Sequence, residues 1–294
     1  MNTQQRQSGA AKTISVLMPV YRNDKPDQVK EAFRSVTSGQ LEPPDEVVIV
    51  RDGPVPVQLN WLLADWAKRG DVTLVELRRN QGLAAALNAG LSRCRNDIVA
   101  RQDADDISRP DRFKLTWPRL AVEGFDLVGG AMREFGLGDG GAAAVREFGL
   151  GGDSQDQTVR SYPLISPEIE HQARLMNPLA HPTVMFRRAV VLEAGGYRPF
   201  FHLEDYDLWV RLMMAGARIA NLPDVLVDYR VSEAAYRRRG GLRTLRAELA
   251  LQREFVRTGF IGPATMARNL VVRGGFEVAP VWLRRIALTR LHDS

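Results

Sequence analysis

The sequence predicts an α/β fold in which a sheet is flanked by helices and followed by a helical C-terminal extension. Short apolar runs alternate with helix-like segments over the first third of the chain, and this alternation is typical of a parallel sheet with helices on both faces. Of the 294 residues, 45% are apolar, which suffices for a sizeable core and argues against wholesale disorder. The length fits one large domain with an appendage, or two modest domains.

Four short runs rich in Val, Ile or Leu, each bounded by polar or turn residues, predict buried strands. They cover residues 14–18, 46–50, 72–77 and 98–100. Helix-like segments lie between them at 27–38, 59–68 and 82–93, with apolar residues at helical spacing. Glycines soon after the first two of these segments indicate where the helices end.

The pattern breaks in a glycine-rich stretch at 124–152, which contains a direct repeat. The residues REFGLG at 133–138 recur at 146–151. One such pair is too little for a solenoid and fits a small duplication in a hairpin or loop. Beyond it, residues 188–194 and 205–215 predict helices, 219–228 predicts a last strand, and the chain from 233 onward is helical in pattern and arginine-rich.

The cysteine content and the N-terminal residues indicate the cellular compartment in which the protein resides. Cys94 is the only cysteine, so a disulfide framework and a cysteine-based zinc site are excluded within one chain, and a reducing compartment fits best. Residues 1–12 are polar, unlike a signal peptide, and are expected to form a flexible tail. No stretch approaches the roughly 18 apolar residues of a spanning helix. We therefore expect a cytoplasmic protein, or one that lies peripherally at the inner face of the cell membrane.

The net charge of +5 is placed unevenly along the chain. Residues 230–294 hold 13 Arg, no Lys and 5 acidic residues, a balance of +8. Such a stretch can meet the phosphates of lipid headgroups, nucleic acid or an anionic acceptor, or can form a solvated helical surface. Residues 278–291 combine apolar side chains, Trp282 among them, with arginines, which suits either interfacial membrane binding or docking on the preceding domain or on a second copy.

Polar side chains follow three of the predicted strands at the point where each strand ends. Pro19-Val20-Tyr21 follows the first, Asp52-Gly53-Pro54 the second and Asp103-Ala104-Asp105-Asp106 the fourth. The carboxyl ends of parallel strands meet at one edge of a sheet, where ligands bind. Carboxylates gathered there repel one another unless a cation or a donor-rich ligand offsets their charge.

The aspartates at 103–106 predict a site for a hard divalent cation. Mg²⁺ and Mn²⁺ take oxygen ligands, and Mg²⁺ commonly uses one or two carboxylates together with substrate phosphates. The competing interpretation is an acidic turn that caps a helix beginning near Ser108-Arg109-Pro110. The position after a strand, with Asp52 expected nearby, favours the cation site.

Five motifs in order resemble those of the family 2 glycosyltransferases, whose fold is the nucleotide-sugar-binding type called GT-A, a Rossmann-like mixed sheet flanked by helices. The motifs are SVLMPVY at 15–21, EVVIVRDG at 46–53, RNQGLAAALN at 79–88, DADD at 103–106 and EDYDLW at 204–209. The resemblance covers residues 13–231 and implies a GT-A glycosyltransferase domain over 13–232. A basic helical extension would then occupy 233–294.

The resemblance implies that four of the motifs bind a nucleotide-sugar donor. Pro19, Tyr21 and Asp52 would line the nucleoside pocket, and Arg79 and Asn80 would lie against the nucleotide. The segment that begins at Asn80 also fits an ordinary helix entry turn, and both interpretations can hold together.

The resemblance further implies a metal cofactor, Mn²⁺ or Mg²⁺. Asp103 and Asp105 would serve the ribose and the metal, with Asp105 the more direct ligand. The metal would bridge the diphosphate and neutralise the leaving group.

The fifth motif implies a catalytic base. An inverting transfer needs a carboxylate opposite the leaving diphosphate, within hydrogen-bond reach of the acceptor hydroxyl, and Asp205 is the candidate. The alternative is a charge at a helix N-terminus, worth roughly 0.3–1 kcal/mol. Glu204, Trp209 and His181 would lie on the acceptor side, although a purely structural role suits His181 equally well.

Two positions depart from the family pattern. The second motif often reads Asp-Asp-Gly-Ser, and here it reads Arg51-Asp52-Gly53-Pro54. Some members place a metal-binding histidine soon after the last strand, where this chain has Ser232, so metal ligation would rest on the aspartates, the diphosphate and water. Processive members carry a Gln-x-x-Arg-Trp motif and spanning helices, and without these we expect addition of a single sugar.

The sequence thus predicts an inverting, metal-dependent transferase that moves one sugar from a UDP-linked donor to a hydroxyl of a glycan or lipid-linked acceptor, in surface polysaccharide or glycolipid assembly. No nucleic-acid partner is expected. Residues 18–23 carry neither a GxGxxG turn nor a Walker phosphate loop, which disfavours a dehydrogenase and a P-loop nucleotidase. A sugar-phosphate nucleotidyltransferase would want a glycine- and basic-rich loop there. A non-catalytic nucleotide-sugar-binding protein stays a third alternative, against which the intact Asp105 and Asp205 argue.

Overall fold

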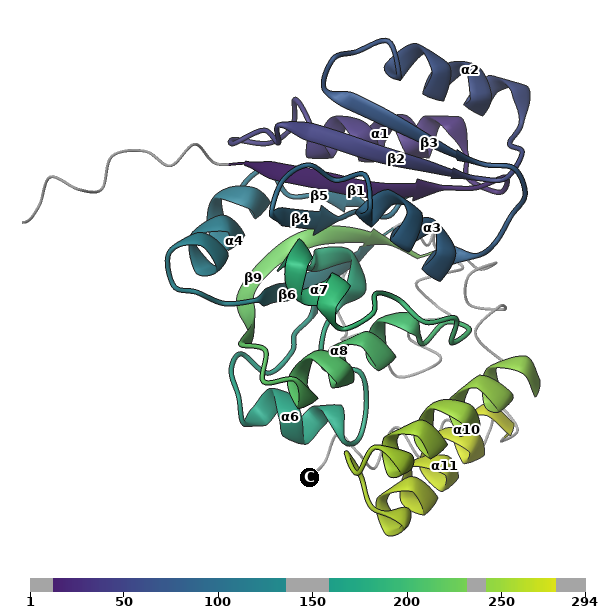
Figure 1. Cartoon of the computed structure of the whole chain (residues 1–294), viewed down its shortest axis with the longest axis vertical. Helices are drawn as coiled ribbons and strands as arrows, with labels where there is room; N and C mark the ends of the chain where they lie inside the picture. The colour runs from purple at the N-terminus through teal and green to yellow at the C-terminus, as the bar shows by residue number, and fades with distance from the viewer. Residues whose placement is uncertain (1–12, 136–158, 232–241, 279–294) are drawn as a thin grey trace, which may run out of the picture.

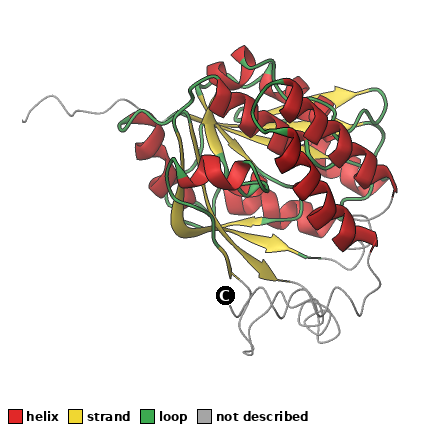
Figure 2. Ribbon diagram, turned by 90° about the horizontal axis from the view of Figure 1, so that it is seen from below, coloured by secondary structure: helices red, strands yellow, loops and turns green. Residues whose placement is uncertain are grey.

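The computed structural model describes residues 13–135, 159–231 and 242–278. These residues form one nine-stranded mixed sheet with helices on both faces (Figures 1 and 2). The predicted α/β class and the mixed sheet are thereby confirmed. Along the sheet the strands lie in the order β3-β2-β1-β4-β8-β6-β9-β5, and β7 pairs with β6.

The first half of the sheet is parallel, as the sequence predicts. Its strands are β1 (Ile14–Val20), β2 (Glu46–Asp52), β3 (Val72–Leu77) and β4 (Ile98–Arg101). Each of the four apolar runs falls inside one of these strands. The helices α1 (Pro26–Val36), α2 (Val57–Trp66) and α3 (Leu83–Leu91) connect them. Because the strands are parallel, the residues that follow β1, β2 and β4 open onto the same edge.

The second half of the sheet is mixed. Its long pair, β6 (Leu127–Phe135) and β9 (Ile219–Arg230), is parallel, and β8 (Met185–Arg187) runs antiparallel between β6 and β4. Two short strands complete it, β5 (Ile107–Ser108) against β9 and β7 (Val159–Arg160) against β6. The sequence did not reveal β6, because Gly129 and Gly130 interrupt its apolar run. A Cβ at Gly130 would lie 2.5 Å from Leu226 Cδ1, so glycine lets β6 approach β9 closely.

The remaining helices follow the mixed half. They are α4 (Arg112–Ala121), α6 (Glu168–Ala173), the 3₁₀ helix η1 (His181–Thr183), α7 (Arg188–Glu193), α8 (Glu204–Met214), α10 (Leu242–Arg257) and α11 (Pro263–Val278). The helices expected at 188–194 and 205–215 are confirmed as α7 and α8. The helix expected near Ser108 is not there: Ser108 belongs to β5, and α4 begins at Arg112. The aspartates at 103–106 therefore do not cap a helix, and that interpretation is wrong.

Buried apolar side chains fill both faces of the sheet. Residues of α1, α2 and α4 pack on one face, and residues of α3, α7 and α8 pack on the other. A third cluster joins α8 to the two C-terminal helices through Tyr206, Val210, Leu251, Phe255 and Phe260. α10 and α11 therefore pack on the helix that begins with Glu204 and Asp205 (Figure 1).

Several predicted features lie outside the described residues. They are the tail at 1–12, the second copy of the REFGLG repeat with the end of the first, Ser232, and the stretch after Val278. The start of the first copy, Arg133 to Phe135, ends β6. Of the helices that the structure describes, none is both long and apolar enough to cross a bilayer.

Candidate active site

The loop after β4 brings three aspartates together at the carboxyl edge of the sheet. Arg101, the last residue of β4, forms an ion pair through Nη1 with the Asp103 carboxylate. The Gln102 side-chain amide donates to the carbonyl oxygens of Asp103 (3.0 Å) and Asp106 (2.8 Å). These contacts, all between residues 101–106, hold the loop in place.

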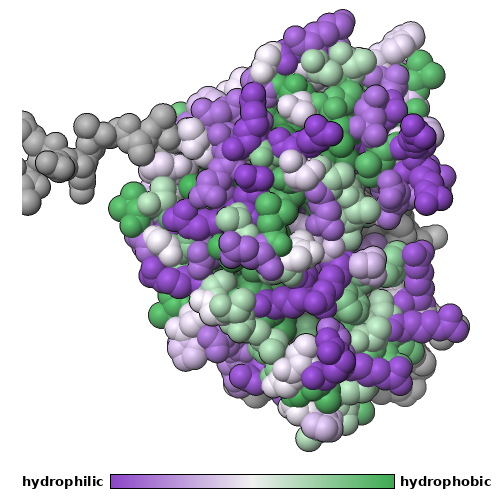
Figure 3. Space-filling model, viewed as in Figure 1, coloured by the Kyte–Doolittle hydropathy of each residue, from purple (hydrophilic) through white to green (hydrophobic). Residues whose placement is uncertain are grey.

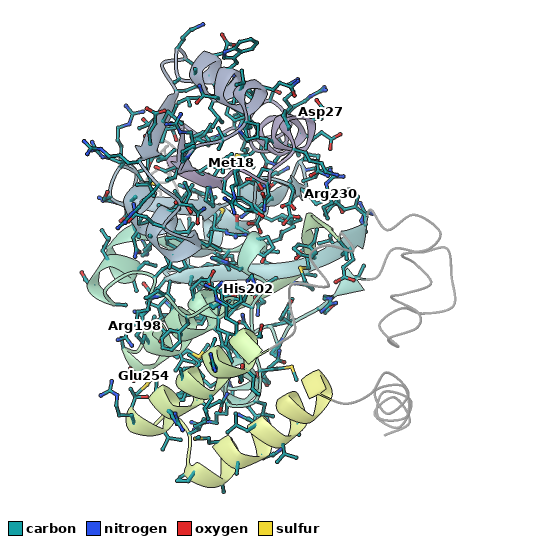
Figure 4. The ribbon with its side chains drawn as sticks, turned by 90° about the vertical axis from the view of Figure 1, so that its right-hand side faces the viewer. Met18, Asp27, Arg198, His202, Arg230 and Glu254 are labelled. Atoms are coloured by element: carbon teal, nitrogen blue, oxygen red, sulfur yellow. The ribbon has the colours of Figure 1, made fainter. Side chains whose placement is uncertain are left out.

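Arg230, at the end of β9, holds the same loop from the opposite side. Its backbone N–H donates to Asp106 Oδ1 over 2.8 Å, and its Nε donates to the Asp105 carbonyl over 2.9 Å. Arg230 Nη2 also lies 2.6 Å from Glu31 Oε2 of α1. A residue 125 positions away in sequence thus fixes the backbone of the aspartate loop; Figure 4 shows Arg230 at the rim of the molecule.

The electrostatics of this loop favour a cation. Burial, together with the charge of Asp103, raises the pKa of Asp105 to about 6. The same two causes raise the pKa of Asp106, which is fully buried. A raised carboxylate pKa means that negative charge is costly at this place, and a bound cation would lower that cost.

The residues present fit a metal only if the substrate completes its coordination. Within the described part of the chain, no group of three or more His, Cys, Asp or Glu side chains is placed to hold a metal ion. Asp103 and Asp105 offer two carboxylates, which is the protein contribution that Mg²⁺ commonly uses when phosphates and water supply the rest. The candidate third ligand at Ser232 lies outside the described residues.

Asp52 organises a turn at the same edge of the sheet. It is 4% exposed, and its carboxylate accepts hydrogen bonds from Asn80 Nδ2 (2.9 Å) and from the backbone N–H groups of Gln81 (2.7 Å) and Gly82 (2.9 Å). Asp52 therefore fixes the turn that leads into α3 and holds the Asn80 side chain; Arg79 and Asn80 are both exposed residues of this turn. The sequence interpretation of this turn as a helix entry is consistent with α3 starting at Leu83.

Pro19 and Tyr21 lie at the end of β1, on the same edge. Pro19 is half-buried within the strand, and Tyr21 follows in a tight turn. The Tyr21 N–H donates to Asp24 Oδ2 over 2.8 Å, and the Asp24 N–H donates back to the Tyr21 carbonyl over 3.1 Å. The structure thus brings the ends of β1, β2 and β4 together as the sequence predicts.

Asp205 lies in the first turn of α8 and is held by a neighbour from another segment. Asn177 Nδ2 donates to Asp205 Oδ2 over 2.7 Å. Burial raises the pKa of Asp205, and the hydrogen bond from Asn177 opposes that rise. The neighbouring Glu204 is 6% exposed, and burial, followed by the charge of Asp205, raises its pKa to about 7.

The other acid of this turn has a different environment. Asp207 is buried and paired with Arg211 at 2.8 Å, one helical turn further along α8, and with Arg198 at 3.6 Å. Arg211 also donates to the Gly196 carbonyl over 2.6 Å. Asp207 therefore fixes α8 against the segment that precedes it, whereas Asp205 has no cationic partner at hydrogen-bond distance among the residues that the structure describes.

His181, which is half-buried, packs against Trp209, which lies four residues after Asp205 on α8. His181 Nε2 lies 3.2 Å from the Tyr197 hydroxyl, and the His181 ring meets the Trp209 ring edge-on at 5.8 Å. Burial, and then the charge of Arg101, holds the pKa of His181 well below its ordinary value, so the ring is neutral. Trp209 is fully buried.

Sequence reasoning missed three residues of this site: Arg101, Asn177 and Arg230. Arg101 is 2% exposed, and its charge opposes the rise in pKa that burial causes in Asp105, Glu204 and Asp205. A single buried guanidinium therefore acts on both carboxylate groups. The available signal was an arginine at the end of an otherwise apolar strand, directly before the aspartates.

The mixed sheet with carboxylates at the ends of its parallel strands defines a GT-A glycosyltransferase fold, and comparison with known proteins agrees. The model of the family described as glycosyl transferase family 2 matches residues 15–194. The chain belongs to this family and is a glycosyltransferase.

Two relatives cover most of the chain. The amylovoran biosynthesis glycosyltransferase AmsE of Erwinia amylovora is 36% identical over 257 residues, which span 84% of this chain and 88% of that protein. The UDP-Gal:alpha-D-GlcNAc-diphosphoundecaprenol beta-1,3-galactosyltransferase of Escherichia coli is 30% identical over 272 residues, 92% of this chain and 93% of that protein. Glycosyltransferases of polysaccharide and glycolipid biosynthesis are thus among its relatives.

Solved structures show the same fold at lower identity. Residues 1–349 of S. aureus TarS in complex with UDP-GlcNAc superimpose with a TM-score of 0.64 at 16% identity, covering 94% of this chain and 79% of that one. The mannosyltransferase PcManGT from Pyrobaculum calidifontis, in complex with GDP-Man and Mn²⁺, gives a TM-score of 0.58 at 19% identity, with 94% and 73% covered. In the crystal structure of the longer S. aureus TarS chain, the match covers 45% of that chain.

Proposed function

We propose that this glycosyltransferase moves a single sugar, with inversion, from a UDP-linked donor to a hydroxyl of a glycan or lipid-linked acceptor. The observation that carries the proposal is that the site contains two sets of carboxylates in different environments. Asp103 and Asp105 lie in a loop that favours a cation, and Asp205 lies on a different element, α8, where the Asn177 amide donates to it. In this proposal residues 13–232 are the catalytic domain and residues 233–294 an extension.

The donor side of the site uses the residues gathered at the carboxyl edge. Pro19, Tyr21 and the turn that Asp52 holds would bind the nucleoside, with Arg79 and Asn80 against the nucleotide. The names of two similar proteins support a uridine nucleotide: the E. coli relative uses UDP-Gal, and TarS was solved with UDP-GlcNAc. PcManGT binds GDP-Man, so a guanosine nucleotide is the alternative to test.

Asp105 and Asp103 would hold a divalent ion, Mn²⁺ or Mg²⁺, between the protein and the diphosphate. When bound, the ion supplies positive charge against the diphosphate leaving group. Support comes from the raised pKa of Asp105 and from the Mn²⁺ in PcManGT.

Asp205 would accept the proton of the acceptor hydroxyl. As the acceptor oxygen forms its bond to the anomeric carbon, the bond from that carbon to the diphosphate breaks, and the proton passes to the Asp205 carboxylate. Attack from the face opposite the leaving group inverts the anomeric centre and makes a β linkage from an α-linked donor. Asn177 donates to Oδ2 of Asp205, and a carboxylate has further lone pairs with which to accept the proton of the acceptor hydroxyl.

His181, Glu204 and Trp209 would shape the acceptor side. His181 is neutral and hydrogen-bonded to Tyr197, so it would contribute shape and a polar ring edge. The relatives act in amylovoran biosynthesis and on a diphosphoundecaprenol-linked sugar, which supports surface polysaccharide or glycolipid assembly at the inner face of the cell membrane as the setting.

A screen of nucleotide sugars tests this function. Donor binding and turnover are measured with Mn²⁺, Mg²⁺ or EDTA for the wild type and for Asp105→Ala. We expect one UDP-sugar to bind and turn over, and Asp105→Ala to lose metal-dependent binding. If no nucleotide sugar binds under any condition, the proposed function is wrong.

A further inference from the structure

The outer face of α10 carries a stripe of arginines. Arg243, Arg246, Arg253 and Arg257 are exposed, and their spacing of 3, 7 and 4 residues places them on one side of the helix. The two acids of α10 do not neutralise the stripe as a whole: Glu248 is buried, and Glu254 pairs with Arg257 and Arg198. Among the described residues, neither Arg246 nor Arg253 has an ion-pair partner.

The adjacent helix presents an apolar face. Over residues 263–272, the part of α11 whose side chains the structure describes, the exposed residues are Pro263, Ala264, Ala267, Arg268, Val271 and Val272. Val271 is 73% exposed and Val272 is 60% exposed. These six residues include one arginine and no acid, so their charge has the same sign as the stripe on α10. Figure 3 shows hydrophilic and hydrophobic side chains side by side over the lower part of the molecule, where these helices lie.

These two helices are fixed to the segment that carries Asp205. Arg198 Nη1 lies 2.9 Å from Glu254 Oε1 of α10, and the two labelled residues lie close together at the left of Figure 4. The Arg243 guanidinium lies 3.9 Å from the centre of the Phe201 ring, four residues before Asp205. A surface that binds α10 and α11 would therefore be held beside the proposed acceptor side of the site.

We propose that the outer face of the α10–α11 hairpin, made of the α10 arginines and the exposed α11 residues, binds an anionic lipid surface. Guanidinium groups pair with phosphate oxygens, and exposed valines beside them can enter the headgroup boundary, as in interfacial helices. Nucleic acid would match the arginines but leave the valines without a partner.

The link to catalysis rests on the proposed function, since a lipid-linked acceptor would be presented at such a surface. Surface binding itself does not depend on that function, and it is measured without donor or acceptor. A soluble acceptor then reports separately whether the active site of each variant is intact.

Flotation of the full chain with vesicles tests the proposal. Phosphatidylglycerol vesicles are compared with phosphatidylcholine vesicles at low and high salt, for the wild type and for the double variant Arg246→Glu, Arg253→Glu. Each basic residue near an anionic membrane increases the membrane partition coefficient about fivefold. We therefore expect the double variant to bind phosphatidylglycerol vesicles more than about tenfold more weakly than the wild type. Binding of the wild type should weaken with salt.

Two further variants sharpen the result. The control double variant, Arg34→Glu with Arg93→Glu, reverses the charge of two exposed arginines outside α10 and α11. It should bind the vesicles as the wild type does. Val271→Ser with Val272→Ser should weaken binding while keeping the charge. All variants should keep wild-type turnover on a soluble acceptor.

Equal binding of the wild type and the α10 double variant would overturn the proposal, as would wild-type protein that ignores phosphatidylglycerol. Binding of RNA that depends on Arg246 and Arg253, without vesicle binding, would assign the face to nucleic acid instead. A dimer that dissociates in the Val271→Ser, Val272→Ser variant, again without vesicle binding, would assign it to a second copy of this chain.

Discussion

Asn177 donates a hydrogen bond from Nδ2 to Oδ2 of Asp205 over 2.7 Å. The two residues are 28 positions apart, and the bond joins the segment before η1 to the first turn of α8. It stabilises the ionised form of the carboxylate and so opposes the rise in pKa that burial causes. Asn177 is therefore placed to orient the proposed base and to set its protonation.

Asn177→Asp should move the acid limb of the pH profile of kcat to higher pH. Asp205 must be ionised to accept a proton, and Asn177→Asp replaces a donor by a second negative charge. The charge of Arg101 opposes the rise in the pKa of Asp205, and Asp205 also interacts with Glu204 and Tyr197. These three groups are the same in the wild type and in the variant, so a shift of the limb reports the change at position 177. Asn177→Ala should shift the limb the same way but less. An unchanged profile in both variants would contradict a link between Asn177 and the base.

Glu204→Gln should stabilise the protein above neutral pH. The pKa of Glu204 is about 7 in the folded chain against an ordinary 4.5, so the folded state binds the proton more tightly than the unfolded state does. The contribution of Glu204 to stability is therefore greatest below pH 4.5 and is lost as pH rises through 7. We expect the variant to raise the free energy of unfolding at pH 8 by on the order of 1–3 kcal/mol, and to match the wild type near pH 4.

Denaturant unfolding at the two pH values measures this difference. The exposed Glu193 of α7 gives a matched control, since Glu193→Gln should change little at either pH. A stabilisation that is the same at both pH values would show that titration of Glu204 is not its cause.

Gly53→Ala should destabilise the protein and weaken donor binding, whereas Gly70→Ala should do neither. Gly53 has φ +81°, and a Cβ there would lie 2.4 Å from the Asn80 N atom, so the turn that Asp52 holds would have to move. The expected loss is about 1–3 kcal/mol in unfolding. A Cβ at Gly70 meets nothing within 4 Å. Thermal unfolding and UDP-sugar titration of both variants make the comparison, and equal behaviour would contradict the role given to this close approach.

The sequence predicted the parallel half of the sheet because its strands are continuous apolar runs separated by amphipathic helices. It missed β6, where two glycines replace apolar side chains, and β5, whose two residues are too few to show a period. The aspartates were recognised from their place after β4. Asn177 and Arg230 were not, because their roles depend on contacts with residues distant in sequence. Arg101 was overlooked although its ion pair with Asp103 is local.

Asp205 is the proposed base, and we expect the donor to bind independently of it at the edge formed by Asp52, Asp103 and Asp105. Asp205→Asn keeps the shape of the side chain but removes the charge that accepts a proton. With saturating donor and acceptor, the variant should lose roughly 10²–10⁴ in kcat while its dissociation constant for the UDP-sugar stays within about twofold of the wild-type value. Wild-type kcat in Asp205→Asn, with donor binding intact, would contradict the account.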